Sequence, residues 1–249
     1  MPALESYDRA LTYSYAPGVF PSIECLKRRP TLARRLLIHS RSESNAGVHE
    51  LREMCGALGI REETADRALR KLSHKDNCYA AVVFDKPTDA LDPSRSHVAL
   101  DRPSDYGNLG TILRSLAGFG FNDLAIFEPA ADVFDPRVVR ASMGAIFAMR
   151  IQSFRDYAAY RAVYPDHAIF PFMLGASREL PELSCVRSPY ALIFGNEGEG
   201  LPESFIGEGT PVRIPHTGDI DSLNLAVAVS IGAYAFCQAE NNTSRRDGL

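Results

Sequence analysis

Three short stretches in the second half of the chain combine glycine with amide, carboxylate or guanidinium side chains, which can bind and orient ligands. The first motif is DYGNLGTILRSLAGFGF, residues 105–121, in which Asn108 and Arg114 are six positions apart. Gly110 between them permits a tight strand-to-helix turn. An arginine in this position can either bind an anionic group of a substrate or serve as a structural ion-pair partner. Taken alone, the first motif leaves both roles open.

The second motif is GNEGEGL, residues 195–201, which directly follows the apolar segment YALIF. Its three glycines surround Glu197 and make a loop whose backbone can approach a ligand closely, as an adenine or methionine moiety requires. The motif lacks the Gly-Lys-Ser/Thr sequence of a triphosphate-binding loop, and Glu197 would repel phosphates. Nucleotide hydrolysis is therefore disfavoured, and the alternative to a ligand loop is an ordinary glycine-rich turn.

The third motif is IPHTGDIDSLN, residues 214–224, which leads into an apolar segment. Ser222 occupies the expected N-cap of a helix that we predict over residues 222–239. Asn224 would then lie just inside that helix, where a buried amide needs a hydrogen-bond partner. The position of Asn224 therefore favours contact with a ligand or a packed loop.

The segments around the motifs alternate between predicted strands and predicted helices. Strands are predicted over residues 97–101, 123–128, 168–173, 190–195 and 211–215, and helices over 111–119, from Asp135-Pro136 onward and over 222–239. Such alternation predicts an α/β fold with a mostly parallel sheet covered by helices. The active sites of such sheets lie at the carboxyl ends of the strands, where the three motifs are expected.

A smaller αβ domain is predicted to precede this fold. It comprises a strand over 33–40, helices over 46–60 and 61–72, and a strand over 79–85. Residues 86–96 contain two prolines and no apolar periodicity, which is typical of a linker. We therefore predict an N-terminal domain over residues 1–88 and a catalytic domain over 89–249.

Composition narrows the class of protein. The 249 residues are 45% hydrophobic, enough for a large core, yet no apolar run approaches the length of a membrane span or a signal-peptide core. The five cysteines are scattered without metal-ligand spacing, so neither disulfides nor a metal are expected. No GxGxxG follows the first strand of the larger domain, which disfavours a dinucleotide-dependent dehydrogenase. We expect a cytoplasmic protein with no membrane partner.

Charge is unevenly distributed along the chain. The net charge is −4, but residues 1–75 contain 13 Lys/Arg against 9 Asp/Glu, a balance of +4 that leaves −8 elsewhere. The basic residues cluster at Lys27, Arg28, Arg29, Arg34, Arg35 and Arg41. Such a cluster can bind a phosphate backbone, so Lys27 to Arg35 are predicted RNA contacts; the alternative is a solvated face.

In combination, the three motifs resemble the signature of the SpoU (TrmH) class of the SPOUT methyltransferases. That class has N-x-G-x-x-x-R, G-x-E-x-x-G-L and I-P-x-x-G-x-x-x-S-L-N elements, in this order. The matching residues are Asn108, Gly110 and Arg114; Gly195, Glu197, Gly200 and Leu201; and Ile214, Pro215, Gly218, Ser222, Leu223 and Asn224. The resemblance covers residues 97–238, and residues 20–85 look like the ribosomal-protein-like substrate-binding domain that many such enzymes carry.

The resemblance implies an S-adenosylmethionine-dependent methyltransferase that acts on a ribose 2′-hydroxyl of rRNA or tRNA. It also implies a C-terminal trefoil knot, a homodimer and no metal. The implied cofactor contacts are Gly195, Asn196, Gly200, Ile214, Leu223 and Asn224. The RNA and the nucleotide stay open.

The resemblance further implies a set of catalytic-site residues: Arg114, Asn108, Glu197, Ser222 and Asn224. Because a guanidinium does not lose its proton in a protein, Arg114 is expected to clamp the target phosphate and stabilise the developing alkoxide. Glu197 is expected to orient Arg114 or the loop of the second motif, and Asn108 is expected to orient the ribose or phosphate. Ser222 and Asn224 are expected to orient the turn of the third motif.

The chain departs from many relatives at His216, Asp219 and Asp221, which place a titratable ring and acidic groups in the third motif. A histidine after a strand-end proline is more often structural than catalytic, so His216 receives no catalytic role. Two other functions are compatible with the motifs: methylation of a base nitrogen, and RNA binding by a SPOUT fold without catalysis. The SLN element, residues 222–224, together with Arg114 favours the ribose over a base, and the joint presence of Asn108, Arg114, Glu197 and Asn224 disfavours loss of catalysis.

Overall fold

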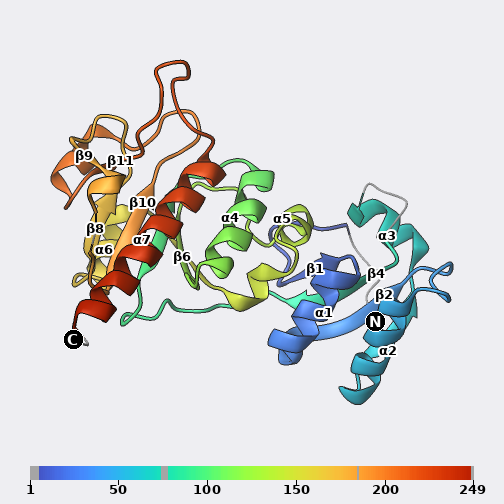
Figure 1. Cartoon of the computed structure of the whole chain (residues 1–249). Coiled ribbons are helices and arrows are strands. Elements are labelled where there is room, and N and C mark those ends of the chain that lie inside the picture. The colour runs from blue at the N-terminus through green and yellow to red at the C-terminus, as the bar shows by residue number, and fades with distance from the viewer. Residues whose placement is uncertain (1–5, 74–77, 184, 248–249) are drawn as a thin grey trace. The chain divides into compact units, whose positions relative to one another are not determined.

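The computed structural model describes residues 6–73, 78–183 and 185–247. The chain forms two compact units (Figure 1). The N-terminal unit comprises the residues up to Pro87 together with 109–114 and 132–148, and the C-terminal unit comprises 88–108, 115–131 and 149–249. Two short segments of the predicted catalytic domain therefore belong to the compact unit that contains the N-terminal residues.

The N-terminal unit contains a four-stranded sheet with the strand order β1-β4-β2-β3. Its strands are β1 (Tyr13–Pro17), β2 (Ala33–Ile38), β3 (Arg61–Thr64) and β4 (Ala80–Asp85). β4 runs antiparallel to both β1 and β2, whereas β3 runs parallel to β2. Every residue of β4 except the last is buried, because this apolar strand lies inside the sheet. The predicted strands over 33–40 and 79–85 are confirmed.

The helices of the N-terminal unit are α1 (Val19–Arg28), α2 (Ala46–Ala57), α3 (Asp66–Ser73) and α5 (Pro136–Ala141), with 3₁₀ turns at Pro30–Leu32 and Ala145–Ala148. α2 begins at Asn45, whose side chain accepts a hydrogen bond from the amide of Val48. It ends just before Gly59, which adopts a φ of 67° that favours glycine. The predicted helix over 46–60 is therefore confirmed, and Asp135 caps α5 as Asp135-Pro136 predicts.

The single helix predicted over residues 61–72 is wrong. Arg61–Thr64 form strand β3, and the helix α3 begins only at Asp66. β3 is an edge strand with no buried residue, so it carries no alternation of apolar and polar positions. Of the apolar residues that suggested a helix, Leu69 and Leu72 belong to α3, and Ala65 immediately precedes it.

The C-terminal unit contains a five-stranded parallel sheet with the strand order β7-β6-β5-β10-β8. Its strands are β5 (His97–Asp101), β6 (Asp123–Phe127), β7 (Arg150–Phe154), β8 (Ala168–Pro171) and β10 (Tyr190–Phe194). A separate two-stranded sheet pairs β9 (Arg178–Glu179) with β11 (Val212–Arg213), and 3₁₀ turns occur at Leu180–Glu182 and Glu203–Gly207. The predicted α/β class with a mostly parallel sheet is confirmed, and the trefoil knot stays a prediction.

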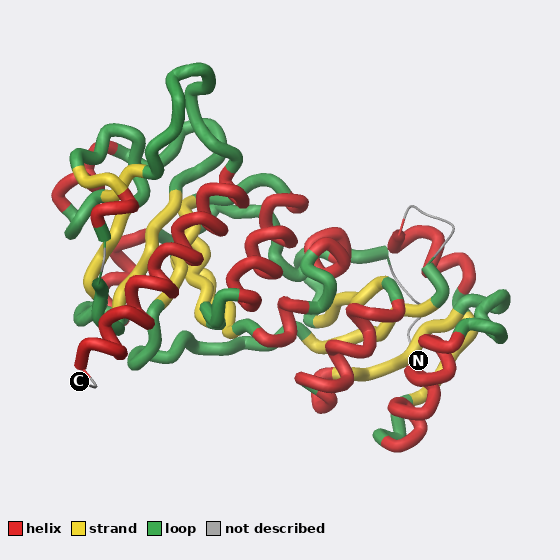
Figure 2. Tube along the Cα trace, viewed as in Figure 1, coloured by secondary structure: helices red, strands yellow, loops and turns green. Residues whose placement is uncertain are grey.

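Helices cover both faces of the parallel sheet (Figures 1 and 2). α7 (Leu225–Asp247) packs on one face, where the ring of Phe236 lies 5.2 Å from that of Tyr190. α6 (Tyr157–Val163) packs on the other face, where the ring of Tyr160 lies 5.4 Å from that of Phe154. Burial of each such aromatic side chain stabilises the fold by roughly 1.5–3 kcal/mol. The described part of the chain has no helix with the length and apolarity to cross a membrane.

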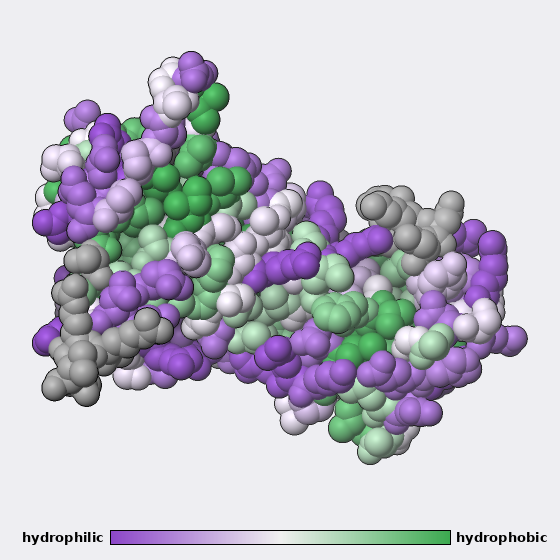
Figure 3. Space-filling model, in the orientation of Figure 1, coloured by the Kyte–Doolittle hydropathy of each residue, from purple (hydrophilic) through white to green (hydrophobic). Residues whose placement is uncertain are grey.

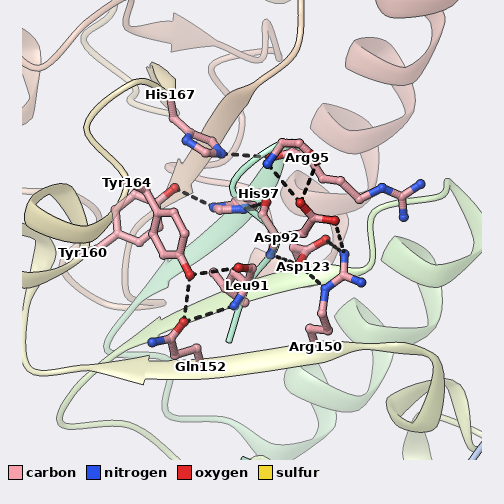
Figure 4. Close-up of polar contacts among 11 residues, drawn as sticks. Leu91, Asp92, Arg95, His97, Asp123, Arg150, Gln152, Tyr160, Tyr164 and His167 are labelled. Atoms are coloured by element: carbon pink, nitrogen blue, oxygen red, sulfur yellow. Dashed lines mark hydrogen bonds and ion pairs between the residues drawn. The ribbon is translucent and has the colours of Figure 1, made fainter. Parts of the chain in front are cut away.

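A buried polar network closes the amino-terminal edge of this sheet (Figure 4). His97, at the start of β5, contacts the hydroxyl of Tyr160 at 2.9 Å through Nδ1 and the carbonyl oxygen of Asp92 at 2.8 Å through Nε2. Arg150 donates from Nε to the buried carboxylate of Asp123 at 2.6 Å. The irregular segment before β5 is thus fixed at this edge, and the long loops emerge from the opposite, carboxyl-terminal edge.

Candidate active site

The connections of the parallel sheet reverse direction between β5 and β10. From β5 the chain continues outward to β6 and β7, whereas β10 and β8 lie on the other side of β5. Loops that leave two neighbouring strands in opposite directions open a crevice at their carboxyl ends, where α/β proteins bind ligands. At this switch point the first motif follows β5 and the second motif follows β10.

The second motif forms a tight loop in which its ends approach closely. The amide of Gly200 donates to the carbonyl oxygen of Asn196 at 2.9 Å, and Gly200 has a φ of 68°. A Cβ atom at Gly195 would lie 2.1 Å from the backbone carbon of Gly200. Only glycine fits at position 195, and the backbone conformation of Gly200 favours glycine, whereas Gly198 meets no such constraint.

The loop of the second motif is clamped to the residues that follow β5. Asn196 donates from Nδ2 to the carbonyl oxygen of Arg102 at 2.6 Å, and its Oδ1 accepts from the amide of Gly198 at 2.8 Å. Arg102 in turn pairs with Glu199 at 3.0 Å. Arg102 has a φ of 50°, a left-handed conformation that is uncommon for a residue with a side chain. Sequence patterns gave no signal for Arg102, because its contribution is a backbone carbonyl.

Glu197 is the polar centre of this clamp. Its carboxylate accepts hydrogen bonds from the amide and hydroxyl of Ser104 at 3.1 and 3.0 Å, from the amide of Asp105 at 3.2 Å and from Nδ2 of Asn108 at 3.2 Å. Burial raises the pKa of Glu197, but the hydrogen bonds to its charged form outweigh burial, so this pKa lies below its usual value. Glu197 is therefore an ionised anchor for the loop, and no hydrogen bond joins it to Arg114 among the described residues.

Asn108 and Asn224 join the first motif to the third. Nδ2 of Asn224 donates to Oδ1 of Asn108 at 3.0 Å, while the other end of the Asn108 amide binds Glu197. One polar chain, Asn224–Asn108–Glu197, therefore links all three motifs. The amide groups hold each other in a fixed orientation because each donor has one acceptor.

Ser222 is not the N-cap of the final helix, contrary to the prediction. α7 begins at Leu225, and Oδ1 of Asn224 accepts from the amides of Ala226 at 2.9 Å and Val227 at 3.3 Å. Asn224 is thus the cap, and it also provides the contact to Asn108. The spacing of apolar residues in α7 does not distinguish a cap at 222 from one at 224, since both precede the apolar run.

Gly110 does not form a strand-to-helix turn. α4 (Tyr106–Gly118) begins five residues before the predicted start, because the side chain of Asp105 accepts from the amide of Asn108 at 2.7 Å and caps it. Gly110 therefore lies inside the helix, where an added Cβ would lie 2.3 Å from the Cβ of Ala141 in α5. Its role is to permit close packing of α4 and α5.

Arg114 lies on the exposed side of α4. It is exposed, and the described residues offer it no hydrogen-bond or ion-pair partner, so the structural ion-pair role is not observed. Six residues of helix rotate it by about 120° from Asn108, which faces Glu197 and Asn224. Asn108 and Arg114 therefore project from different faces of the same helix.

A cavity of about 450 Å³ lies beside the second motif. Five of the six predicted cofactor contacts line it, namely Gly195, Asn196, Gly200, Ile214 and Leu223, whereas Asn224 does not. Phe172, Met173 and Leu174 after β8 also line it and were not predicted. Their position at the carboxyl end of a parallel strand is the only signal in the sequence that would have indicated them.

The polar residues of the third motif contribute to the same cavity. Ser222, His216 and Asp221 line it, and all three are exposed. Nδ1 of His216 contacts the carbonyl oxygen of Ile214 at 3.0 Å. Within the described ranges, no group of three or more His, Cys, Asp and Glu side chains is arranged to hold a metal ion.

The predicted RNA contacts lie in the N-terminal unit, and each has a partner within the unit. Lys27 pairs with Glu50 at 3.4 Å, Arg28 with Glu24 at 2.7 Å, Arg35 with Glu63 at 2.9 Å and Arg34 with Asp85. Arg29 donates to the carbonyl oxygen of Phe147 at 3.3 Å. Four of these five cations are therefore neutralised by carboxylates, and their contact with RNA stays a prediction.

Comparison with known proteins identifies relatives of both the sequence and the fold. The family model described as "SpoU rRNA Methylase family" matches residues 95–234. A 23S rRNA (uridine(2479)-2′-O)-methyltransferase from Streptomyces viridochromogenes is 33% identical over 185 residues, which cover 67% of this chain and 63% of that protein. A 23S rRNA (guanosine(2553)-2′-O)-methyltransferase from Bacillus subtilis is 28% identical over 157 residues, which cover 62% of each protein. The chain thus spans about three fifths of the length of these curated relatives.

Solved structures extend the similarity to almost the whole chain. The AdoMet-bound rRNA methyltransferase from Sinorhizobium meliloti superposes with a TM-score of 0.76 at 26% identity, covering 96% of this chain and 88% of that chain. The SpoU methyltransferase AviRb from Streptomyces viridochromogenes, in complex with AdoMet, gives a TM-score of 0.75 at 25% identity, with coverages of 91% and 90%. Because the family model matches more than half of the 249 residues and its range contains all three motifs, the chain belongs to the SpoU rRNA methylase family.

Proposed function

We propose that this protein transfers the methyl group of S-adenosylmethionine to a ribose 2′-hydroxyl of ribosomal RNA. The observation that carries the proposal is the polar chain Asn224–Asn108–Glu197 beside the cavity at the β5/β10 switch point. Two curated relatives are named as ribose 2′-O-methyltransferases of 23S rRNA, which supports this substrate class. The proposed activity applies to the whole protein, including the N-terminal unit.

The cavity fits S-adenosylmethionine in size and in charge. Sites for ligands of this size usually measure roughly 300–1,000 Å³, which includes the observed volume of about 450 Å³. Its described lining includes the rings of Phe172 and Phe194 and the carboxylates of Glu203 and Asp221, but no lysine or arginine. Apolar walls suit an adenine ring, and an anionic rim suits a cationic sulfonium. We propose that Gly195, Asn196, Gly200, Ile214 and Leu223 hold the cofactor.

The chain's own residues would position the substrate and stabilise its charge. When bound, S-adenosylmethionine would supply a methyl carbon activated by its positively charged sulfur, and the neutral thioether S-adenosylhomocysteine would be the leaving group. We propose that Arg114, which has no protein partner among the described residues, binds the phosphate next to the target ribose and the developing alkoxide. The hydroxyl proton would leave to a phosphate oxygen, because the guanidinium keeps its own protons. Asn108, Glu197 and Asn224 are proposed as positioning residues.

We further propose that two copies of the chain pair through α7. Val227, Ile231 and Tyr234 follow one another at helical spacing and are 46%, 38% and 53% exposed. Figure 3 shows apolar residues gathered on the face of the C-terminal unit where α7 lies. A self-complementary apolar stripe is typical of isologous dimers. Since Arg114 and Asn108 act from different faces of α4, we propose that Arg114 completes the site of the partner.

Replacement of Arg114 tests the proposed reaction. Arg114→Ala should reduce methyl transfer by a factor on the order of a hundred or more, because one donor to the developing oxyanion is lost. Cofactor affinity measured by calorimetry should stay nearly unchanged, since the described cavity lining does not include Arg114. Arg114→Lys is the matched variant, because it keeps the charge but lacks the planar guanidinium. Its activity should fall between that of the unaltered protein and that of Arg114→Ala.

The assay follows tritiated methyl transfer to ribosomal RNA and maps the product by resistance of the modified nucleotide to alkaline hydrolysis. Normal turnover by Arg114→Ala would contradict the role of Arg114. Label recovered on a base rather than a ribose would contradict the 2′-hydroxyl as target, and cofactor binding without transfer to any ribosomal RNA would indicate a non-catalytic protein.

A further inference from the structure

Helix α3 in the N-terminal unit presents three cations on one face. Arg67, Arg70 and Lys71 are exposed and are separated by three and four positions, which places them side by side on a helix. The opposite face contributes Leu69 to the core of the unit and packs Leu72 against it. The three cations therefore point to solvent because the apolar residues of α3 fix its orientation on the sheet.

None of these three cations forms an ion pair or hydrogen bond with a described residue. The nearest acidic residue in sequence is Asp66, whose carboxylate oxygens accept from the amide and hydroxyl of Ser40 at 2.8 and 2.7 Å. These hydrogen bonds are the main cause of its lowered pKa, and Arg70 makes a smaller electrostatic contribution. Among the described residues, the positive charge of the helix face is thus left largely uncompensated.

The acidic residues of the neighbouring strand β3 are also occupied. Glu62 pairs with Arg52 at 2.9 Å, and Glu63 pairs with Arg35 at 2.9 Å. Arg35 is one of the predicted RNA contacts, and its charge is compensated by Glu63. The charges of the α3 cations are not compensated in this way by described residues. The cations of α3 therefore have no carboxylate partner among the described residues, whereas four of the five predicted RNA contacts, Lys27, Arg28, Arg34 and Arg35, are paired with carboxylates.

The uncompensated face extends into the loop before α2. Ser40 is hydrogen-bonded to Asp66 at the start of α3, so the next residue, Arg41, lies close to that helix. Arg41 is exposed, and its side chain has no partner among the described residues. We name Arg41, Arg67, Arg70 and Lys71 the α3 surface.

The arrangement of the α3 surface is unfavourable for the isolated protein. Arg67 and Lys71 are like charges at i and i+4, an arrangement that destabilises a helix by roughly 0.2–0.5 kcal/mol. A ligand with closely spaced negative charges would remove this repulsion. The planar fork of arginine matches the two oxygens of a phosphate, and a nucleic-acid backbone repeats that group at short intervals.

We propose that the α3 surface is the main contact of the N-terminal unit with the RNA backbone. The inference rests on the proposed function, because RNA is the polyanion that an rRNA methyltransferase must capture. It predicts sequence-independent binding through counterion release, so the affinity should depend steeply on salt. It also assigns the paired cations Lys27, Arg28 and Arg34 a smaller share of RNA binding.

The test compares full-length variants by fluorescence anisotropy with a labelled RNA hairpin of roughly 30 nucleotides, titrated at several salt concentrations. R67A/R70A/K71A should weaken binding about tenfold or more near physiological salt. The slope of log affinity against log salt should become shallower by roughly two, since each lost phosphate contact contributes about 0.7–0.9. The charge-conserving variant R67K/R70K/K71R should keep most of the affinity and the slope.

A comparison variant separates the α3 surface from net charge. K27A/R28A/R34A removes the same three positive charges from the same unit, but breaks ion pairs with carboxylates. It should weaken RNA binding less than R67A/R70A/K71A does, and it should lower the midpoint temperature of thermal unfolding. R67A/R70A/K71A should keep or raise that midpoint temperature. An equal or larger loss of affinity in K27A/R28A/R34A, or no RNA binding by the unaltered protein, would overturn the inference.

Failure of the proposed function gives a different result. If the unaltered protein transfers no methyl group to ribosomal RNA while R67A/R70A/K71A still weakens hairpin binding, the activity is wrong and the surface stands. A preference of the surface for an acidic peptide over the hairpin at equal charge would instead identify a protein partner and overturn the assignment to RNA.

Discussion

At the scale of single residues, charged groups divide into those that are paired within the fold and those without a partner among the described residues. Glu197 accepts four hydrogen bonds from the loop after β5 and from α4, so its charge serves the structure of the site. Arg114 has no such partner among the described residues, although both side chains belong to motifs. Under the proposed function, Glu197 therefore belongs to the scaffold of the site, whereas Arg114 is available to the substrate.

His97 gives a pH dependence of stability that can be measured. Burial lowers the pKa of His97 to about 4, against 6.5 for an unperturbed histidine. Between these values the unfolded chain binds a proton that the folded chain excludes, so stability is complete above about pH 6.5 and decreases as pH falls toward 4. The loss should be about 3 kcal/mol from this group, and His167, whose pKa burial also lowers, acts in the same direction.

Urea unfolding at intervals between pH 4 and 7 measures this dependence. His97→Asn should be less stable than the unaltered protein at pH 7, because it loses contacts to Tyr160 and Asp92. Its stability should nevertheless change less between pH 6.5 and 4. Equal slopes for the two proteins would show that another group controls the acid limb.

At the scale of elements, the glycines of α4 give opposite predictions. Gly110→Ala should destabilise the protein by roughly 1–3 kcal/mol, because the new methyl group would overlap with Ala141 of α5. Gly118→Ala in the same helix has no atom within 4 Å of the new Cβ and should stabilise by up to about 1 kcal/mol. Chemical denaturation of both variants checks the pair, and destabilisation by both would argue against the packing role of Gly110.

Strongly apolar elements were predictable, whereas boundaries set by single polar contacts were not. The buried strands β4 and β10 are continuous apolar runs and follow directly from the sequence. β3 lacks such a run because it is an exposed edge. The starts of α4 and α7 depend on Asp105 and Asn224, whose capping bonds are specified only in three dimensions.

The same distinction applies to the candidate site. The motifs predict which residues gather at the switch point, because parallel strands bring their carboxyl ends together. They do not predict that Asn108 bridges Glu197 and Asn224, or that Arg102 contributes its carbonyl oxygen. Side-chain pairing and backbone contributions leave little trace in residue type, so these features required the structure.

At the scale of the whole molecule, the proposed dimer can be tested through α7. Sedimentation should give a mass of about twice 27.3 kDa. Ile231→Asp should shift the protein to a monomer, because a charge would replace an apolar residue in the proposed interface. Val163→Asp on α6, at a position that is 55% exposed, is the matched control and should leave the mass unchanged. A monomer at micromolar concentration for the unaltered protein would contradict both the dimer and a site that Arg114 shares between copies.

The two loops that border the cavity differ in how much of their conformation is already determined. The loop of the second motif is held by its own hydrogen bonds and by the contacts of Asn196, Glu197 and Glu199. Residues 217–223, in the segment that projects beyond the sheet before α7 (Figure 1), have no hydrogen bond to any described residue outside this segment. Binding of a ligand between the two loops would cost little conformational entropy in the loop of the second motif, because that loop is already ordered. It would have to order residues 217–223. The affinity of the cavity for its ligand should therefore depend on the free energy that is needed to order residues 217–223.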